Sequence, residues 1–209
     1  MTLLLVIIYA ATLLYLCSIE RFRHYALVVG VQGWILFIVA LLQLKETSIS
    51  ENIFIITETL LLKGILVPYL LFRIIKKLPV TKTHQNSMSP MFITLIGIVL
   101  MGVSMWLTSV VYSHCDNIIF FAVAIFGALI GLLLITVHRR IFAHLVGFLV
   151  IENSVLLFAF ALGAHIPMLI NIGVLLDILM GVLLLGFFIT KISLETPTLD
   201  SQELTNLKD

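Results

Sequence analysis

Uninterrupted apolar runs of about 20 residues constrain the fold of this chain more than any other feature. Seven such runs lie between short polar segments, at 2–19, 25–44, 53–75, 91–112, 118–137, 141–163 and 167–190. A helix of about 20 apolar residues matches the hydrocarbon thickness of a bilayer. Lipid offers no partner for free backbone groups, so each run is expected to be helical. The sequence therefore predicts an all-α, polytopic membrane protein with seven transmembrane helices.

The composition excludes several classes of function. Hydrophobic residues make up 61% of the chain and charged residues 11%, whereas soluble proteins carry about 25% charged residues. A net charge of +1 gives no indication of nucleic-acid binding. Two cysteines cannot build an iron–sulfur cluster or a thiolate zinc site. We therefore expect no cofactor in this chain and no catalysis by this chain alone.

The positions of the basic residues predict how the helices cross the membrane. All Lys and Arg except Lys45 and Lys63 fall at alternate ends of the predicted helices, on the side that also holds the C-terminus. Basic residues concentrate on the cytoplasmic side of membrane proteins. We therefore expect a multi-pass protein of the cell inner (plasma) membrane, with the N-terminus outside and the C-terminus cytoplasmic. The residues concerned are Arg21, Arg23, Arg73, Lys76, Lys77, Lys82, Arg139, Arg140, Lys191 and Lys208.

The connections divide the chain into four predicted segments. Residues 1–80 form a three-helix membrane segment, 81–117 a basic loop and the fourth helix, 118–194 a second three-helix segment, and 195–209 a cytoplasmic tail. No loop is long enough for a soluble domain. Pro68 frees a carbonyl one turn earlier, at Gly64, and so predicts a kink beside Lys63.

Three ionisable residues are predicted to share one layer at the membrane midplane. Counted from the basic end of each helix, Lys63, Glu152 and Asp177 lie at a depth of roughly 18–21 Å. Ionisable groups at this depth cost about 2.5–3.5 kcal/mol on insertion scales, so functional use is the default hypothesis. Two carboxyls at one depth can share or pass a proton. Glu58, near the outer end of its helix, and His144, near the inner end, are further candidates for a proton relay.

The same residues also have a structural interpretation. A buried Lys–carboxylate pair can simply lock helices together, Glu58 can be hydrated, and a histidine at the interface is usually only solvated. Glu58 and Lys63 are turned about 140° apart on a helix, which is unfavourable for pairing. The counter-ion of Lys63 is therefore expected to be Asp177, Glu152 or a residue of another subunit.

Small residues recur every fourth position in two of the predicted helices. Gly173 and Gly181 flank Asp177 on one helix face, where they would let a neighbouring helix approach the acid closely. Gly127 and Gly131 have the same spacing without a polar companion. We interpret the second pair as a packing feature.

The chain resembles the hydrogenase-4 membrane component E family, a subunit of energy-converting hydrogenase and formate hydrogenlyase-type complexes. The resemblance covers nearly the whole length. It is carried by Lys63-x4-Pro68, by the run Gly147-Phe148-Leu149-Val150-Ile151-Glu152-Asn153, by Ile172-Gly173 followed by Asp177, and by the tail residues Thr198-Leu199-Asp200 and Leu204-Thr205-Asn206-Leu207-Lys208.

The last three predicted helices also resemble the small K-type (4L-type) subunit of respiratory complex I, which carries two buried acids in a proton path. Matching Gly147 and Asn153 puts the first acid of that family at Leu149, whereas this chain has Glu152 three residues later. The second acid matches Asp177, shortened from Glu to Asp. The number of buried carboxyls is retained, and the position of the first one is shifted.

The resemblance implies a non-catalytic membrane subunit that couples redox chemistry to ion translocation by relaying protons. Its implied partners are antiporter-like and quinone-subunit-like membrane subunits and the lipid bilayer. Nickel–iron and iron–sulfur centres would lie in partner subunits, as in a complex I-like oxidoreductase. Two alternatives remain open at this point: a structural membrane spacer, and a subunit of a multisubunit sodium/proton antiporter.

Overall fold

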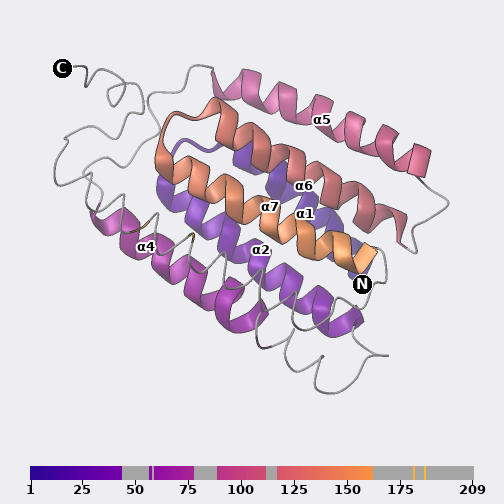
Figure 1. The fold of residues 1–209 in the computed structure, drawn as a ribbon, viewed down its shortest axis with the longest axis horizontal. Coiled ribbons are helices and arrows are strands. Elements are labelled where there is room, and N and C mark those ends of the chain that lie inside the picture. The colour runs from indigo at the N-terminus through magenta and orange to yellow at the C-terminus, as the bar shows by residue number, and fades with distance from the viewer. Residues whose placement is uncertain are drawn as a thin grey trace.

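The computed structural model describes residues 1–43, 57, 59–77, 89–111, 117–161, 181 and 186. Nearly all of these residues are helical, and none of them lies in an extended strand. The predicted all-α fold class is thus confirmed for this part of the chain (Figure 1). In chain order the helices are α1 (Thr2–Ser18), α2 (Phe22–Gln43), the π-helix η1 (Thr59–Leu66), α4 (Val67–Lys77), α5 (Pro90–Val111), α6 (Ile118–Val137) and α7 (Ile141–Ala161).

Four helical segments are long and apolar enough to cross a membrane. They are Phe22–Leu42, Pro90–Val111, Ile118–Val137 and Phe142–Ala161. Helix α1 is also apolar but shorter, with 17 residues. The predicted run at 167–190 lies outside the described residues except for Gly181 and Gly186.

The predicted helix at 53–75 differs from the structure in a way that Pro68 explains. The chain forms the π-helix η1, followed by α4, which continues to Lys77. Proline has no backbone N–H, and its ring clashes with the carbonyl four residues earlier, here that of Gly64. A π-helix widens the turn by pairing each amide with the carbonyl five residues back. The irregularity expected beside Lys63 is therefore a π-helical segment that contains Lys63 itself.

Helices α6 and α7 form a tightly packed antiparallel pair. The amide of Asn117 donates to the carbonyl of Ala161 (3.3 Å), so the start of α6 meets the end of α7. A Cβ atom on Gly131 would lie 2.7 Å from the carbonyl oxygen of Gly147, and one on Gly147 would lie 2.7 Å from that of Gly131. Backbones approach this closely only where side chains are absent. The packing role predicted for Gly131 is confirmed.

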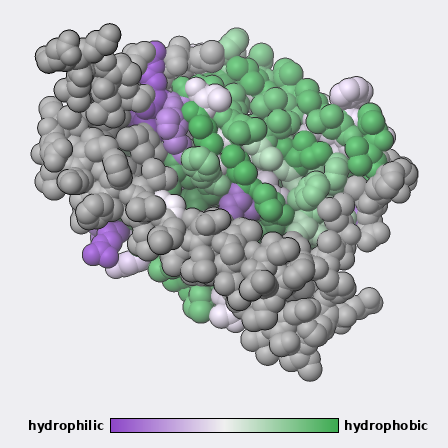
Figure 2. Space-filling view, in the orientation of Figure 1, coloured by the Kyte–Doolittle hydropathy of each residue, from purple (hydrophilic) through white to green (hydrophobic). Residues whose placement is uncertain are grey.

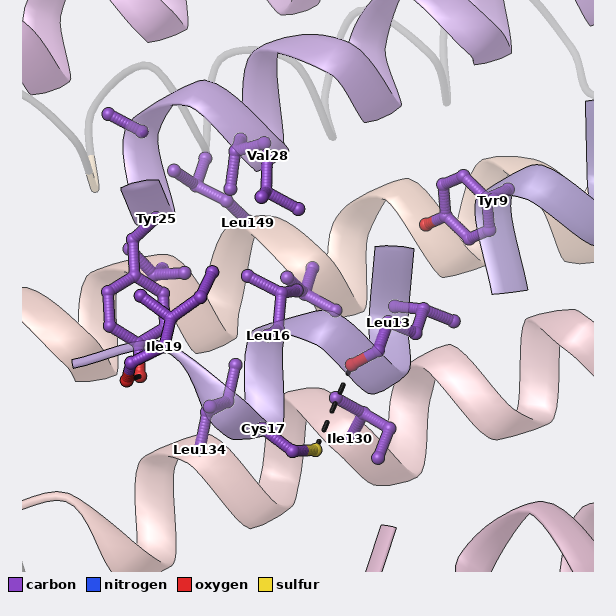
Figure 3. Close-up of a cluster of buried hydrophobic side chains, with 14 of the residues drawn as sticks. Tyr9, Leu13, Leu16, Cys17, Ile19, Tyr25, Val28, Ile130, Leu134 and Leu149 are labelled. Carbon is purple, nitrogen blue, oxygen red and sulfur yellow. Dashed lines mark hydrogen bonds between the residues drawn. The ribbon is translucent and has the colours of Figure 1, made fainter. Parts of the chain in front are cut away.

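The other helices pack around this pair. Helix α1 contacts α6, α2 contacts α7, and α5 lies against α1 and α6 at the edge of the bundle (Figure 1). One buried cluster therefore contains residues from both the first and the last helices, including Leu13, Leu36, Ile130 and Val146. Figure 3 shows part of this cluster, where Leu13 and Leu16 of α1 lie beside Ile130 of α6.

The bundle has an apolar flank and a basic end. Large apolar side chains of α5 are exposed, for example Trp106 at 65%, and Figure 2 shows a broad green surface with one purple patch near its centre and the other purple residues toward one end. The Ser18 and Thr94 hydroxyls are 2.9 Å apart, so α1 ends where α5 begins. Tyr25 and His138 are hydrogen-bonded, so α2 begins where α6 ends. The short connections that carry Arg21 and Arg139–Arg140 thus lie at the same end of the bundle.

Candidate functional site

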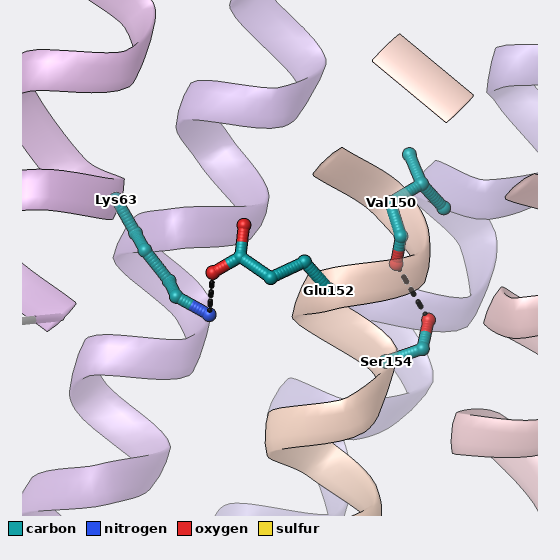
Figure 4. A network of polar contacts seen from close by, with 4 residues as sticks. All are labelled: Lys63, Val150, Glu152 and Ser154. Carbon is teal, nitrogen blue, oxygen red and sulfur yellow. Dashed lines mark hydrogen bonds and ion pairs between the residues drawn. The ribbon is translucent and has the colours of Figure 1, made fainter. Parts of the chain in front are cut away.

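A buried ion pair joins η1 to α7. The Lys63 ammonium Nζ lies 2.7 Å from Glu152 Oε1, and the two side chains are only 7% and 11% exposed. In Figure 4 they point toward one another from separate helices. Both residues come from the interior of long apolar stretches. Two charges so far from water persist only when each neutralises the other.

Close packing of η1 on α2 positions Lys63 for its contact with Glu152. A Cβ atom on Gly33 would lie 2.5 Å from the carbonyl oxygen of Lys63 and 2.8 Å from its carbonyl carbon. Gly33 therefore allows the π-helical backbone to press directly onto α2, which also packs against α7. One turn of α2 earlier, a Cβ atom on Gly30 would lie 3.1 Å from the ring of Pro68. These two close approaches hold Lys63 in register with Glu152.

The residues that follow Glu152 are polar and buried. Asn153 is 3% exposed and Ser154 is 1% exposed. The Ser154 hydroxyl donates to the carbonyl of Val150 (2.7 Å; Figure 4). It also faces Gly127, where a Cβ atom would collide with it. Gly127 thus makes room for a hydroxyl on the facing helix, in keeping with its predicted packing role.

Three polar residues of α1 and α2 are linked by hydrogen bonds, and we call them the α1–α2 polar cluster. They are Tyr9, Thr12 and Gln32. The Gln32 amide nitrogen Nε2 donates to Thr12 Oγ1 (3.0 Å), and the Thr12 hydroxyl donates to the carbonyl of Tyr9 (2.6 Å). The Tyr9 hydroxyl is close enough to interact with Ser154 and with the charge of Glu152. Sequence reasoning missed this cluster, although an amide in the middle of an apolar run was a visible signal.

Two of the five predicted relay residues are brought together. Of the counter-ions left open for Lys63, the structure pairs it with Glu152. Glu58 and Asp177 lie outside the described residues, as does Gly173.

His144 is described but does not join the ion pair. Its Nε2 atom donates to the carbonyl of His138 (2.6 Å) at the basic end of the bundle. It precedes Glu152 by about two turns of α7, roughly 12 Å along the axis. His144 therefore lies where the sequence placed it, near a helix end.

A second polar group at the basic end surrounds His138, which is 3% exposed. Its Nδ1 atom lies 3.2 Å from the carbonyl of Leu134, so this nitrogen carries the hydrogen in the neutral ring and Nε2 is the acceptor. The Tyr25 hydroxyl lies 3.1 Å from both His138 Nε2 and the carbonyl of Ile19, and can donate its one hydrogen to only one of them. Burial lowers the pKa of His138, the hydrogen bond to Leu134 opposes this shift, and the nearby His144 adds to it.

No protein-family model, curated protein or solved structure matches this chain. Among the residues that the structure describes, no cluster of three or more His, Cys, Asp or Glu side chains is arranged to hold a metal ion. The candidate site is therefore defined by its own geometry, a buried Lys–Glu pair beside a cluster of uncharged polar groups.

Proposed function

We propose that this chain is a non-catalytic subunit of a multi-pass membrane complex, in which Lys63 and Glu152 relay protons at the membrane midplane. The observation that carries the proposal is the buried 2.7 Å ion pair between η1 and α7. A proton can pass from the Lys63 ammonium to the Glu152 carboxylate, which leaves a neutral amine and a neutral acid. Because this exchange creates no net charge in lipid, it avoids the cost of an isolated buried ion.

The residues around the Lys63–Glu152 pair favour proton transfer. Lys63 lies in a π-helical segment, and such irregular turns occur frequently at functional sites. Ser154 and Tyr9 supply further hydroxyl groups near the acid, and Gln32 is linked to Tyr9 through Thr12. In this proposal Asp177, Glu58 and His144 are further members of the relay.

The proposed topology has seven spans, with the N-terminus outside and the C-terminus cytoplasmic, in the inner (plasma) membrane. The four membrane-length helical segments and the short connections gathered at one basic end favour this arrangement. The proposed complex is an energy-converting hydrogenase of the formate hydrogenlyase type. Antiporter-like and quinone-subunit-like proteins would be its membrane partners, and nickel–iron and iron–sulfur centres would lie in other subunits. The resemblance of Lys63-x4-Pro68 and of the segment around Glu152 to the component E family is the basis for this assignment.

The competing interpretation is that the ion pair is a structural clamp in a membrane spacer. A double variant, Lys63→Met with Glu152→Leu, separates the two functions. Apolar replacements of similar size for a buried ion pair are often neutral or stabilising, so the complex is expected to assemble. A relay predicts that proton translocation is lost, whereas a spacer predicts that it continues.

The measurement uses the native complex, isolated through a tag on this chain, with its co-purifying subunits identified by mass spectrometry. Proton translocation driven by hydrogen or formate is followed with a pH-sensitive dye in reconstituted vesicles. Glu152→Gln and Asp177→Asn are expected to lower translocation while electron transfer by the soluble subunits remains measurable. Normal proton stoichiometry in the double variant would reject the relay, and a sodium requirement would favour the antiporter relative.

A further inference from the structure

The α1–α2 polar cluster contains two atoms whose hydrogen-bonding capacity is unused. Tyr9 and Gln32 are both 0% exposed. Gln32 Oε1 has no hydrogen-bond partner among the described residues, and the Tyr9 hydroxyl, although close to Ser154, has none that meets hydrogen-bond distance and angle. The other polar atom of Gln32 is already engaged, because Nε2 donates to Thr12. Each side chain thus presents one unsatisfied group to the interior of the bundle.

A polar group in this position needs a partner that the bilayer cannot supply. Lipid tails neither donate nor accept hydrogen bonds. Water satisfies such groups in protein interiors, where it typically makes two to four hydrogen bonds. A hydroxyl both donates and accepts hydrogen bonds, and an amide oxygen accepts them. Water can act as donor or acceptor, so it can satisfy both groups.

The cluster also adjoins the ion pair. The Tyr9 hydroxyl lies beside Ser154 and within range of the Glu152 charge. Ser154 uses its own hydrogen toward the carbonyl of Val150, so it can only accept from a neighbour. Any molecule bound at the Tyr9 hydroxyl therefore lies against α7 beside Ser154, two residues along the helix from Glu152.

We propose that the α1–α2 polar cluster binds ordered water at the Tyr9 hydroxyl and at Gln32 Oε1, and that this water hydrates Glu152 from the side of α1. The water site stands on the geometry of the cluster alone. The role of this water in proton transfer rests on the proposed function. In that role, protons reach Glu152 through the water, and Tyr9 and Gln32 are positioning residues that hold it in place.

Radiolytic labelling of the full chain in its native complex tests the water site directly. Ionising radiation converts bound water into hydroxyl radicals, which modify the side chains in contact with it. Tyr25 is the internal control, because it is also 0% exposed but its hydroxyl lies within hydrogen-bond distance of protein acceptors, the Ile19 carbonyl and His138 Nε2. Figure 3 shows both tyrosines in the same buried cluster. Tyr25 is nearer the basic end of the bundle, so entry of bulk water would favour Tyr25 rather than Tyr9.

Tyr9 is expected to be modified several-fold faster than Tyr25. Tyr9→Phe keeps the ring and removes the hydroxyl, and should reduce modification at this position to the level of Tyr25. Equal modification of Tyr9 and Tyr25 in the unaltered protein would overturn the proposal.

Translocation assays then separate this inference from the proposed function. Tyr9→Phe and Gln32→Leu are expected to slow proton translocation several-fold, while Tyr15→Phe, at a half-exposed tyrosine of the same helix, leaves it unchanged. Labelling of Tyr9 with unchanged translocation in Glu152→Gln would refute the relay and keep the water site. Unlabelled Tyr9 with translocation lost in Glu152→Gln would refute the water site and keep the relay. If Tyr9 is labelled in the unaltered protein but Tyr9→Phe translocates protons at the full rate, the role of this water in proton transfer is refuted.

Discussion

Removing one charge of the Lys63–Glu152 pair is expected to destabilise the protein far more than removing both charges. The two side chains are 7% and 11% exposed and 2.7 Å apart, so each charge has the other as its close counter-ion. A buried charge that loses its partner costs about 3–5 kcal/mol. Glu152→Leu or Lys63→Met alone should therefore reduce the free energy of unfolding by about this amount. If the effects were additive, the double variant would lose roughly 6–10 kcal/mol.

The structure predicts a different result for the double variant. With both charges gone neither position holds an unpaired buried ion, and apolar side chains fill the space between η1 and α7. The double variant should then match the unaltered protein or exceed its stability by up to about 4 kcal/mol. Thermal unfolding in detergent, followed by circular dichroism and repeated in lipid nanodiscs, measures all four members of the cycle. Additive losses in the double variant would show that the two charges do not interact and would refute the reasoning.

Two further predictions concern the glycines and the buried histidine. Gly131→Ala should lower stability by about 1–3 kcal/mol, because its methyl group meets the backbone of Gly147. Gly102→Ala, where a Cβ meets no described atom within 4 Å, should be neutral or slightly stabilising in the same thermal assay. Because the pKa of His138 is lowered in the folded protein, the unfolded chain binds a proton on this ring more tightly. The free energy of unfolding is therefore highest above the ordinary histidine pKa of 6.5 and decreases as the pH falls below it. Melting temperatures between about pH 8 and pH 5 should show this loss, and His138→Gln should reduce it; an identical loss in His138→Gln would assign it to other groups.

Much of the helical architecture was predictable, because apolar runs in a bilayer have few ways to satisfy their backbone. The run at 118–137 became α6 without a change of boundary, and the run at 141–163 became α7, which is described from Ile141 to Ala161. The kink expected at Pro68 proved to be the π-helix η1, since sequence rules state that proline disrupts a helix but not which irregular geometry absorbs the ring.

The candidate site was predictable only in part. Depth along the helices placed Lys63 and Glu152 in one layer, because the rise per residue of a helix is constant. The choice of Glu152 as the partner of Lys63, and the approach of Tyr9 to Ser154, depend on how each helix is rotated about its axis. Rotation is set by contacts between helices that are distant in sequence, such as Gly33 against Lys63.

The amino-acid sequence by itself determined that this chain is helical, that several of its segments can cross a membrane, and that charged side chains lie within its apolar runs. Those properties follow from local chemistry, from the length and polarity of each segment. Only the tertiary structure decided that α2 lies against both η1 and α7, that Lys63 meets Glu152, and that unsatisfied polar atoms of Tyr9 and Gln32 are buried in the bundle. Helix packing makes those choices, because close approach at a few glycines selects one rotation of each helix among many that local hydrophobicity would allow.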